Sequence, residues 1–193
     1  LNLTVNANRN LNTNGQTLAA VNVSGTATLS VANAVDATAL TVNTGATFQS
    51  AAGQTVTVRG NTTLAGTFQD SAGVNRPLVI DTTNNAATVN AGPNTLTAFT
   101  QNGANTIDFG GTELRVAGNV SLTNVSNPGT ITTSGTSALD SGGQTLAALV
   151  VNSGTTTLNN SALSVTALTV NNAATLANNG QTITASDNVT FNG

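Results

Sequence analysis

The sequence contains no His, Cys, Met, Trp, Tyr or Lys, and these absences exclude much chemistry. Without Cys there is no disulfide, thiolate metal ligand or thiol nucleophile. Without His, Lys or Tyr, acid–base catalysis would fall to the carboxylates alone. These are Asp36, Asp70, Asp81, Asp108, Glu113, Asp140 and Asp187. They are scattered and follow no Asp-x-Asp or other metal-binding spacing, so we expect no catalytic residues, no metal site and no cofactor.

Charge is also scarce. Charged residues make up 6% of the chain, against about 25% in ordinary soluble domains, and four Arg against seven acids give a net charge of −3. No basic cluster is available to neutralise phosphates, so we expect no nucleic-acid partner. No apolar run approaches the ~18 residues of a membrane span, and no signal-like segment follows Leu1. We therefore expect no transmembrane segment, and a processed chain or an excised fragment.

What the sequence does have is Asn, Thr, Gly and Ala in a long internal repeat. The 29 Asn and 37 Thr make up about a third of the 193 residues. Segments 15–66 and 143–193 resemble each other, because Gly-Gln-Thr-Leu-Ala-Ala at residues 15–20 returns at residues 143–148. The offset is 143 − 15 = 128, and it drifts by one residue in places. Such self-similarity is typical of repeat architectures.

A shorter period lies inside the long repeat. An apolar-x-Val step is followed some six residues later by Leu or Phe, and successive steps lie 16 to 19 residues apart. The steps fall at Val5/Leu11, Val23/Leu29, Val42/Phe48, Val58/Leu64, Val116/Leu122 and Val170/Leu176, with a looser one at Val151/Leu158. Apolar and polar residues alternate in each unit, as in a half-buried strand. A unit of this size cannot bury its own apolar face, so neighbouring units must stack.

These patterns predict an all-β fold, a parallel β-helix (β-solenoid) of roughly ten coils with a period near 19 residues, forming one domain over residues 1–193. Val, Leu, Ile and Phe would lie inside, and Thr, Ser and Asn outside. Asn residues that follow an inward Val would turn the chain between faces, tolerate the left-handed conformation and stack in amide ladders. They are Asn6, Asn43, Asn152 and Asn171. Gly25, Gly45 and Gly154 would serve similar corners.

The middle, residues 67–142, loses the close repeat. Pro77, Pro93 and Pro128 all fall there, and Pro interrupts a ladder unless it lies at an edge, turn or bulge. We expect longer loops in this segment. If the rod carries a local binding feature, these loops are the first place to look, although plain loop variation is the simpler interpretation.

Two sets of residues offer alternatives to a purely structural role. Asp108, Glu113 and Arg115 could converge from neighbouring strands into a polysaccharide-binding or polysaccharide-cleaving site, although isolated, solvated side chains are the simpler interpretation. Thr-x-Thr steps could stack into a flat ice-binding array, although Thr is also a common outward strand residue. The steps are Thr26/Thr28, Thr55/Thr57, Thr95/Thr97, Thr130/Thr132, Thr155/Thr157 and Thr182/Thr184.

Units such as residues 39–48, Ala-Leu-Thr-Val-Asn-Thr-Gly-Ala-Thr-Phe, resemble the passenger regions of bacterial autotransporters and the filamentous-haemagglutinin-like adhesins. The resemblance is one of composition and period over nearly the whole chain, and it transfers no functional residue. It implies a right-handed β-helix exported across a Gram-negative envelope.

The function we expect is therefore that of an extracellular or cell-surface structural protein or adhesin. Strand-like sequence at both ends predicts self-association into filaments or matrix through the solenoid ends, because unpaired strand edges need a cap or a partner. A host-surface or polysaccharide ligand is a further expectation.

Overall fold

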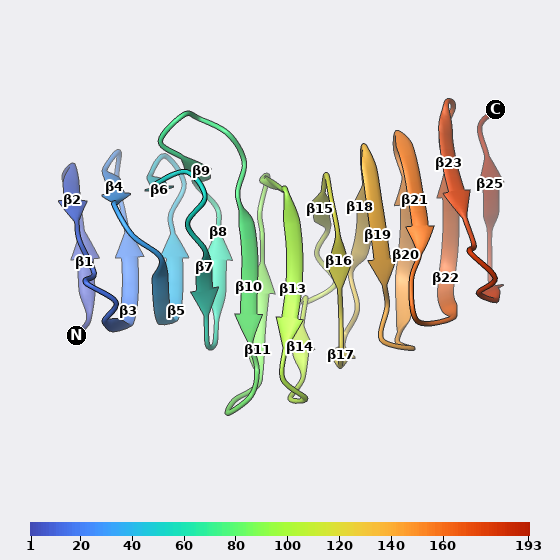
Figure 1. The fold of residues 1–193 in the computed structure, drawn as a ribbon, viewed down its shortest axis with the longest axis horizontal. Helices are drawn as coiled ribbons and strands as arrows, with labels where there is room; N and C mark the ends of the chain where they lie inside the picture. The colour runs from blue at the N-terminus through green and yellow to red at the C-terminus, as the bar shows by residue number, and fades with distance from the viewer.

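A computed structural model describes all residues, 1–193, as a rod of parallel β-strands without a helix. The chain winds through about nine turns with a period of about 20 residues, and its two termini lie at opposite ends of the rod (Figure 1). The predicted all-β solenoid is confirmed. The predicted number of coils, roughly ten, and the predicted period near 19 residues agree with these values. Some coils in the middle are slightly longer, since Pro77 pairs with Ala98 and Phe99 with Val120, 21 residues apart in each case.

The strands are short and follow one another with few loops. The first part of the chain contains β1 (Leu3–Val5), β2 (Arg9–Leu11), β3 (Thr17–Val23), β4 (Thr28–Val31), β5 (Val35–Val42), β6 (Thr47–Ser50), β7 (Val56–Val58), β8 (Thr62–Leu64) and β9 (Thr67–Asp70). The middle contains β10 (Pro77–Asp81), β11 (Ala87–Asn90), β12 (Thr95–Leu96), β13 (Ala98–Asn102), β14 (Ile107–Asp108), β15 (Leu114–Val116), β16 (Val120–Ser121), β17 (Val125–Ser126), β18 (Thr130–Thr133) and β19 (Thr136–Asp140). The last part contains β20 (Thr145–Val151), β21 (Gly154–Leu158), β22 (Leu163–Val170), β23 (Ala174–Ala177), β24 (Ile183–Ala185) and β25 (Val189–Phe191).

Each strand pairs in parallel with strands one coil away, so the strands form columns along the rod. The first column runs β1–β3–β5–β7–β10–β13–β16–β19–β21–β23, and the second branches from β5 through β8, β11 and β14 to β17. The third column runs β12–β15–β18–β20–β22–β24. Strands β2, β4, β6 and β9 form a separate sheet towards the N-terminus. Three short strands per turn therefore enclose the core in the middle of the rod.

The long sequence repeat is also a structural repeat. β3 and β20 have seven residues each, β5 and β22 have eight each, and the paired short strands β7 and β8 match β24 and β25. In both segments a long strand is followed one coil later by two short ones. β5 pairs with both β7 and β8, and β22 pairs with both β24 and β25.

The core is one continuous cluster of 40 buried apolar residues. Alternation puts every second residue inside, as in β22, where Leu163, Val165, Leu168 and Val170 are buried. Phe48 and Phe68 stack one coil apart, with ring centroids 5.6 Å from each other. Each such side chain contributes roughly 1.5–3 kcal/mol relative to an exposed one, so burial along this stripe is what holds successive coils together.

Gly and Asn form the corners of the coils, but the Asn residues with positive φ are not the ones that we predicted. Gly25, Gly45 and Gly154 have positive φ, as predicted. The left-handed Asn residues are Asn14, Asn127, Asn160 and Asn179, so the prediction that the Asn after an inward Val is left-handed was wrong. Three of those corner Asn residues, Asn43, Asn152 and Asn171, form side-chain hydrogen bonds along the rod instead, which an amide can do whatever the sign of φ.

The predicted amide ladder is confirmed near the C-terminus. Asn171 donates from Nδ2 to Oδ1 of Asn152 at 3.0 Å, and Asn192 donates in the same way to Asn171 at 3.0 Å. Near the N-terminus, a single bond of the same kind runs from Nδ2 of Asn43 to Oδ1 of Asn22 at 2.8 Å. Each amide thus bonds to its counterpart in the next coil, which fixes the register of the corner.

The prediction of longer loops in the middle is confirmed for one connection, because residues 71–76 are longer than any loop outside the middle, whereas residues 82–86 are as long as 12–16 and 178–182. Residues 71–76 connect β9 to β10 and residues 82–86 connect β10 to β11, and both connections bulge from the rod (Figure 1). Pro77 is the first residue of β10, Pro93 lies in a turn, and Pro128 lies between β17 and β18. All three positions leave the ladder intact.

Candidate functional site

The seven carboxylates do not gather into one site. Nowhere do three or more His, Cys, Asp or Glu side chains come together as a metal-binding group. Asp108 ends β14 and accepts a hydrogen bond from the N–H of Gly110 at 2.6 Å, which caps a turn. Asp187 is exposed. Most of the other acids meet an arginine or a hydroxyl of a neighbouring coil, so their first role is to join coils.

An ion-pair ladder joins three coils beside the first repeat. Arg59 donates two hydrogen bonds to Asp36, at 2.8 and 2.7 Å, and a third to Asp81 at 2.6 Å. Hydrogen bonds from the side chain and the N–H of Thr83, and more weakly the charge of Arg59, lower the pKa of Asp81. The sequence analysis missed this ladder. The signal was the spacing of 59 − 36 = 23 and 81 − 59 = 22 residues, which is close to one coil.

Two further carboxylates hold loops. Asp70 accepts from the N–H groups of Ala72 and Val74, at 2.8 and 2.9 Å, at the base of the loop 71–76. Its other oxygen lies 3.9 Å from Nη1 of the buried Arg76. Burial raises the pKa of Asp140, but hydrogen bonds from Gly142, Ser161 and Asn160 outweigh it and leave that pKa lowered. Both carboxylates are occupied in shaping the chain.

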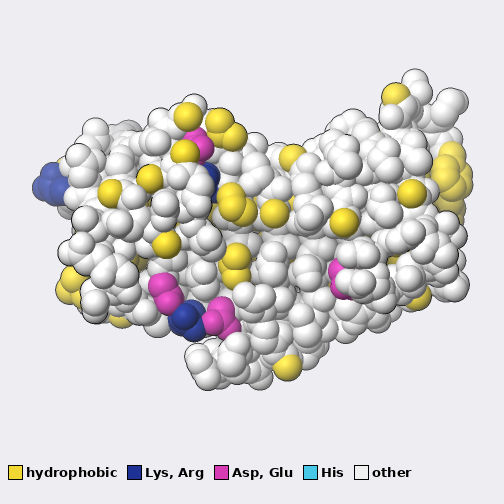
Figure 2. Space-filling model, viewed as in Figure 1, with side chains coloured by type: hydrophobic (Ala, Val, Ile, Leu, Met, Phe, Trp, Pro, Cys, Tyr) yellow, Lys and Arg dark blue, Asp and Glu magenta, His cyan; other side chains and the backbone are white.

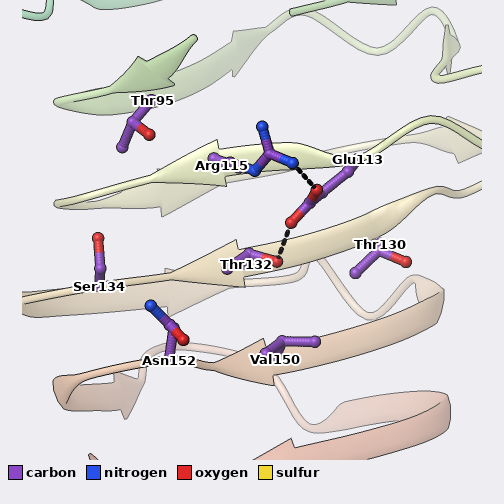
Figure 3. A pocket seen from close by; sticks show the side chains of 8 residues that line it. All are labelled: Thr95, Glu113, Arg115, Thr130, Thr132, Ser134, Val150 and Asn152. Atoms are coloured by element: carbon purple, nitrogen blue, oxygen red, sulfur yellow. Dashed lines mark hydrogen bonds and ion pairs between the residues drawn. The ribbon is translucent and has the colours of Figure 1, made fainter. Parts of the chain in front are cut away.

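The remaining pair, Glu113 and Arg115, lies in an open groove of about 530 Å³. Strand register places Thr95, Arg115, Thr132 and Val150 side by side on β12, β15, β18 and β20, so the groove crosses four coils of the third column. Figure 3 shows the pair at its centre, with polar side chains around it. Four other hollows of the surface measure about 200 to 370 Å³.

The pair is held from two coils. Arg115 donates from Nη2 to Oε2 of Glu113, and the hydroxyl of Thr132 donates to Oε1 at 2.6 Å (Figure 3). The side chains of Arg115 and Glu113 are 43% and 34% exposed, so both reach the groove surface. The structure thus brings together two members of the predicted trio, and places the third, Asp108, on β14 in a different column.

The Thr-x-Thr steps do not stack on one flat face. Thr132 lies between Arg115 and Val150, and Thr57 lies between Asp36 and Val79. Thr155 has Thr136 and Thr175 as neighbours, but on the first column. The alternation that makes Thr face outward sets no common register between distant coils, so the aligned array that ice binding requires is not formed by these steps.

The polar surface has few charges. Figure 2 shows one face of the rod, mostly uncharged polar side chains and backbone, with hydrophobic side chains scattered along it and one patch at the C-terminal end. The structure holds no helix long and apolar enough to cross a membrane.

The fold defines the class of this protein as a parallel β-solenoid. A comparison with family models, curated proteins and solved structures found no match. Of what the resemblance to filamentous-haemagglutinin-like adhesins implied, the structure supports the β-solenoid fold. Membership of that family stays a prediction.

Proposed function

We propose that this chain is an extracellular structural or adhesive β-solenoid whose rods associate end to end into surface fibres or matrix, and that it is not an enzyme. The observation that carries the proposal is the outermost coil at the C-terminal end. There β23, β24 and β25 have a partner strand on one side only, and Phe191 and Val189 are 71% and 48% exposed. Such an edge is a template for pairing with another chain.

The opposite end offers a matching edge. β1 and β2 pair only with β3 and β4, and Leu1 is 86% exposed. Because every ladder in the rod is parallel, an N-terminal edge laid on a C-terminal edge continues the same pattern. A head-to-tail contact of this kind does not close on itself, and it gives filaments. In a longer chain, an adjoining coil would take the same place.

The composition supports export to a cell surface, which we propose for a Gram-negative bacterium. Low charge and abundant Asn and Thr fit such a protein. The carboxylates also support a non-enzymatic role: glycoside hydrolysis needs a free pair of them, and the two that lie close together, Asp36 and Asp81, are both bonded to Arg59.

Negative-stain electron microscopy and light scattering over a concentration series test the assembly. Filaments that lengthen with concentration are the expected result. The double substitution Val189→Asn and Phe191→Asn should reduce the filaments to single rods, because it removes apolar side chains from the C-terminal end. The matched control is Val74→Asn, which changes a 54% exposed apolar residue on the side loop and should leave the filaments unchanged. Uniform single rods of the unaltered chain at high concentration would contradict the proposal.

A further inference from the structure

The groove around Glu113 and Arg115 differs from the Arg59 ladder in the hydrogen-bond donors that it leaves without a protein partner. In the ladder, Arg59 uses three N–H groups on two carboxylates. Arg115 uses only Nη2, on Glu113, and its other N–H groups face the groove without a partner in the protein. A guanidinium has five donors in a fixed fork. The groove therefore presents strong donors that the fold does not use.

The acceptors beside these donors are fixed in place. Oε1 of Glu113 takes the hydroxyl hydrogen of Thr132 and Oε2 takes a hydrogen of Arg115, while each carboxylate oxygen keeps further lone-pair capacity. The three residues come from or adjoin β15 and β18, which pair along their length. The carboxylate and the guanidinium are thus pre-organised by the solenoid, which lowers the entropy cost of binding.

The rest of the lining is uncharged and able both to donate and to accept. It consists of Thr95, Thr130, Ser134 and Asn152, with Val150 as the single hydrophobic member. Side chains on adjacent coils are spaced about 4.8 Å apart, so four coils give a track about 14 Å long. Without an aromatic or a deep apolar pocket, the groove lacks the anchors that a protein partner usually needs.

We propose that this groove binds a neutral glycan chain, whose vicinal hydroxyls donate to Glu113 and accept from Arg115 and the lining hydroxyls. The charge balance selects the neutral class. Glu113 compensates Arg115 within the groove, and the whole chain has a net charge of −3, so an acidic glycan gains no net attraction. The inference rests on the adhesive role proposed above and assigns it a site and a ligand class.

Binding to one groove is expected to be weak, because the groove is open and its hydrogen bonds compete with water. In a fibre the grooves would repeat along the axis, and a long glycan that spans several of them gains through effective concentration. A site of this kind suits adhesion, in which many weak contacts add.

Titration of ¹⁵N-labelled protein with neutral hexasaccharides of glucose, mannose and galactose, followed by amide chemical shifts, tests the proposal. The expected result is a saturable shift confined to β15, β18 and β20 with at least one of the three sugars. Hexagalacturonate at the same concentration should give none. Loss of one charged hydrogen-bonding group, in Glu113→Gln or Arg115→Gln, should weaken binding about tenfold.

Arg59→Gln is the matched control, since it breaks an exposed ion pair of the same kind on another column and should leave binding unchanged. Circular dichroism checks that all variants are folded. Absence of a groove shift with all three neutral sugars overturns the site, and a groove shift with hexagalacturonate alone overturns the ligand class. Because the titration is run on single rods, it succeeds or fails separately from filament formation.

Discussion

The two repeat segments, 15–66 and 143–193, fold into the same series of strands but occupy different columns of the rod. The long strands β3 and β5 of the first repeat lie near the start of the first column, which begins with β1 and ends with the shorter strands β21 and β23. The long strands β20 and β22 continue the third column instead. An offset of 128 residues is not a whole number of turns of about 20 residues, so the second copy starts one column further round.

Their outer coils differ as well. Leu64 in β8 is fully buried under β11, whereas its counterpart Phe191 in β25 is 71% exposed (191 − 64 = 127). Sequence likeness thus sets the shape of a coil, and the neighbouring coil sets its burial. The same side-chain position is therefore stabilising only where a neighbouring coil covers it, as expected when the interfaces between repeats contribute to the stability of a solenoid.

The largest effect is expected from truncating the two counterparts, Leu64 and Phe191, to Ala. Leu64→Ala should lower the free energy of unfolding by about 2–5 kcal/mol, because it leaves a cavity between coils. Phe191→Ala should change it by only about 0.5 kcal/mol, as is usual for an exposed side chain. Urea titration followed by circular dichroism, on protein dilute enough to be single rods, measures both. Equal losses would show that Phe191 is covered in solution.

A second test exchanges the corner residues. Gly45 has φ of 84° and its counterpart Ala173 has φ of 61°, so only the second copy places a Cβ in the left-handed region. Gly45→Ala should cost about 1–2 kcal/mol, through backbone strain and a Cβ only 3.1 Å from the carbonyl oxygen of Gly25. Ala173→Gly should raise the free energy of unfolding by about 0.5–1 kcal/mol. This gain is smaller than the backbone strain that is relieved, because Gly also has more conformational freedom in the unfolded chain. Thermal unfolding checks both signs, and a loss on Ala173→Gly would refute the account.

The smallest expected effect concerns the ion-pair ladder, which only the first repeat has, since Ser164 and Ser186 stand where Asp36 and Arg59 would be. The pKa of Asp81 is lowered from its ordinary value of 3.8 in the folded state. Its contribution to stability is therefore present above that value and is lost as pH falls through the folded pKa. Asp81→Asn should destabilise the rod at pH 7 and much less near pH 2.

Urea titrations of both proteins at the two pH values measure this change. Asp187→Asn, which alters an exposed carboxylate in the last coil, is the control and should show little difference at either pH. A loss for Asp81→Asn that is the same at both pH values would mean that the carboxylate charge does not contribute.

The sequence predicted the fold better than the sites. Alternation in Leu40-Thr41-Val42 identifies inward residues directly, because burial follows the two-residue period of a strand, and both valine and leucine positions are buried as expected. The Arg59 ladder and the Thr132 contact of Glu113 depend on which residues meet across coils. That pairing is set by the length of every intervening loop, and the middle coils vary in length.

By itself, the sequence determined that this chain must be a stack of thin coils. The chain has few large or charged side chains, and its main signals are short-range alternation and small corner residues, which are both local properties. Only the tertiary structure decided which coil lies on which, and with that the column of each repeat, the partners of each arginine and the exposure of the end coil. The physical reason is that strand pairing here is long-range, and each added loop residue shifts every contact between coils that follow it.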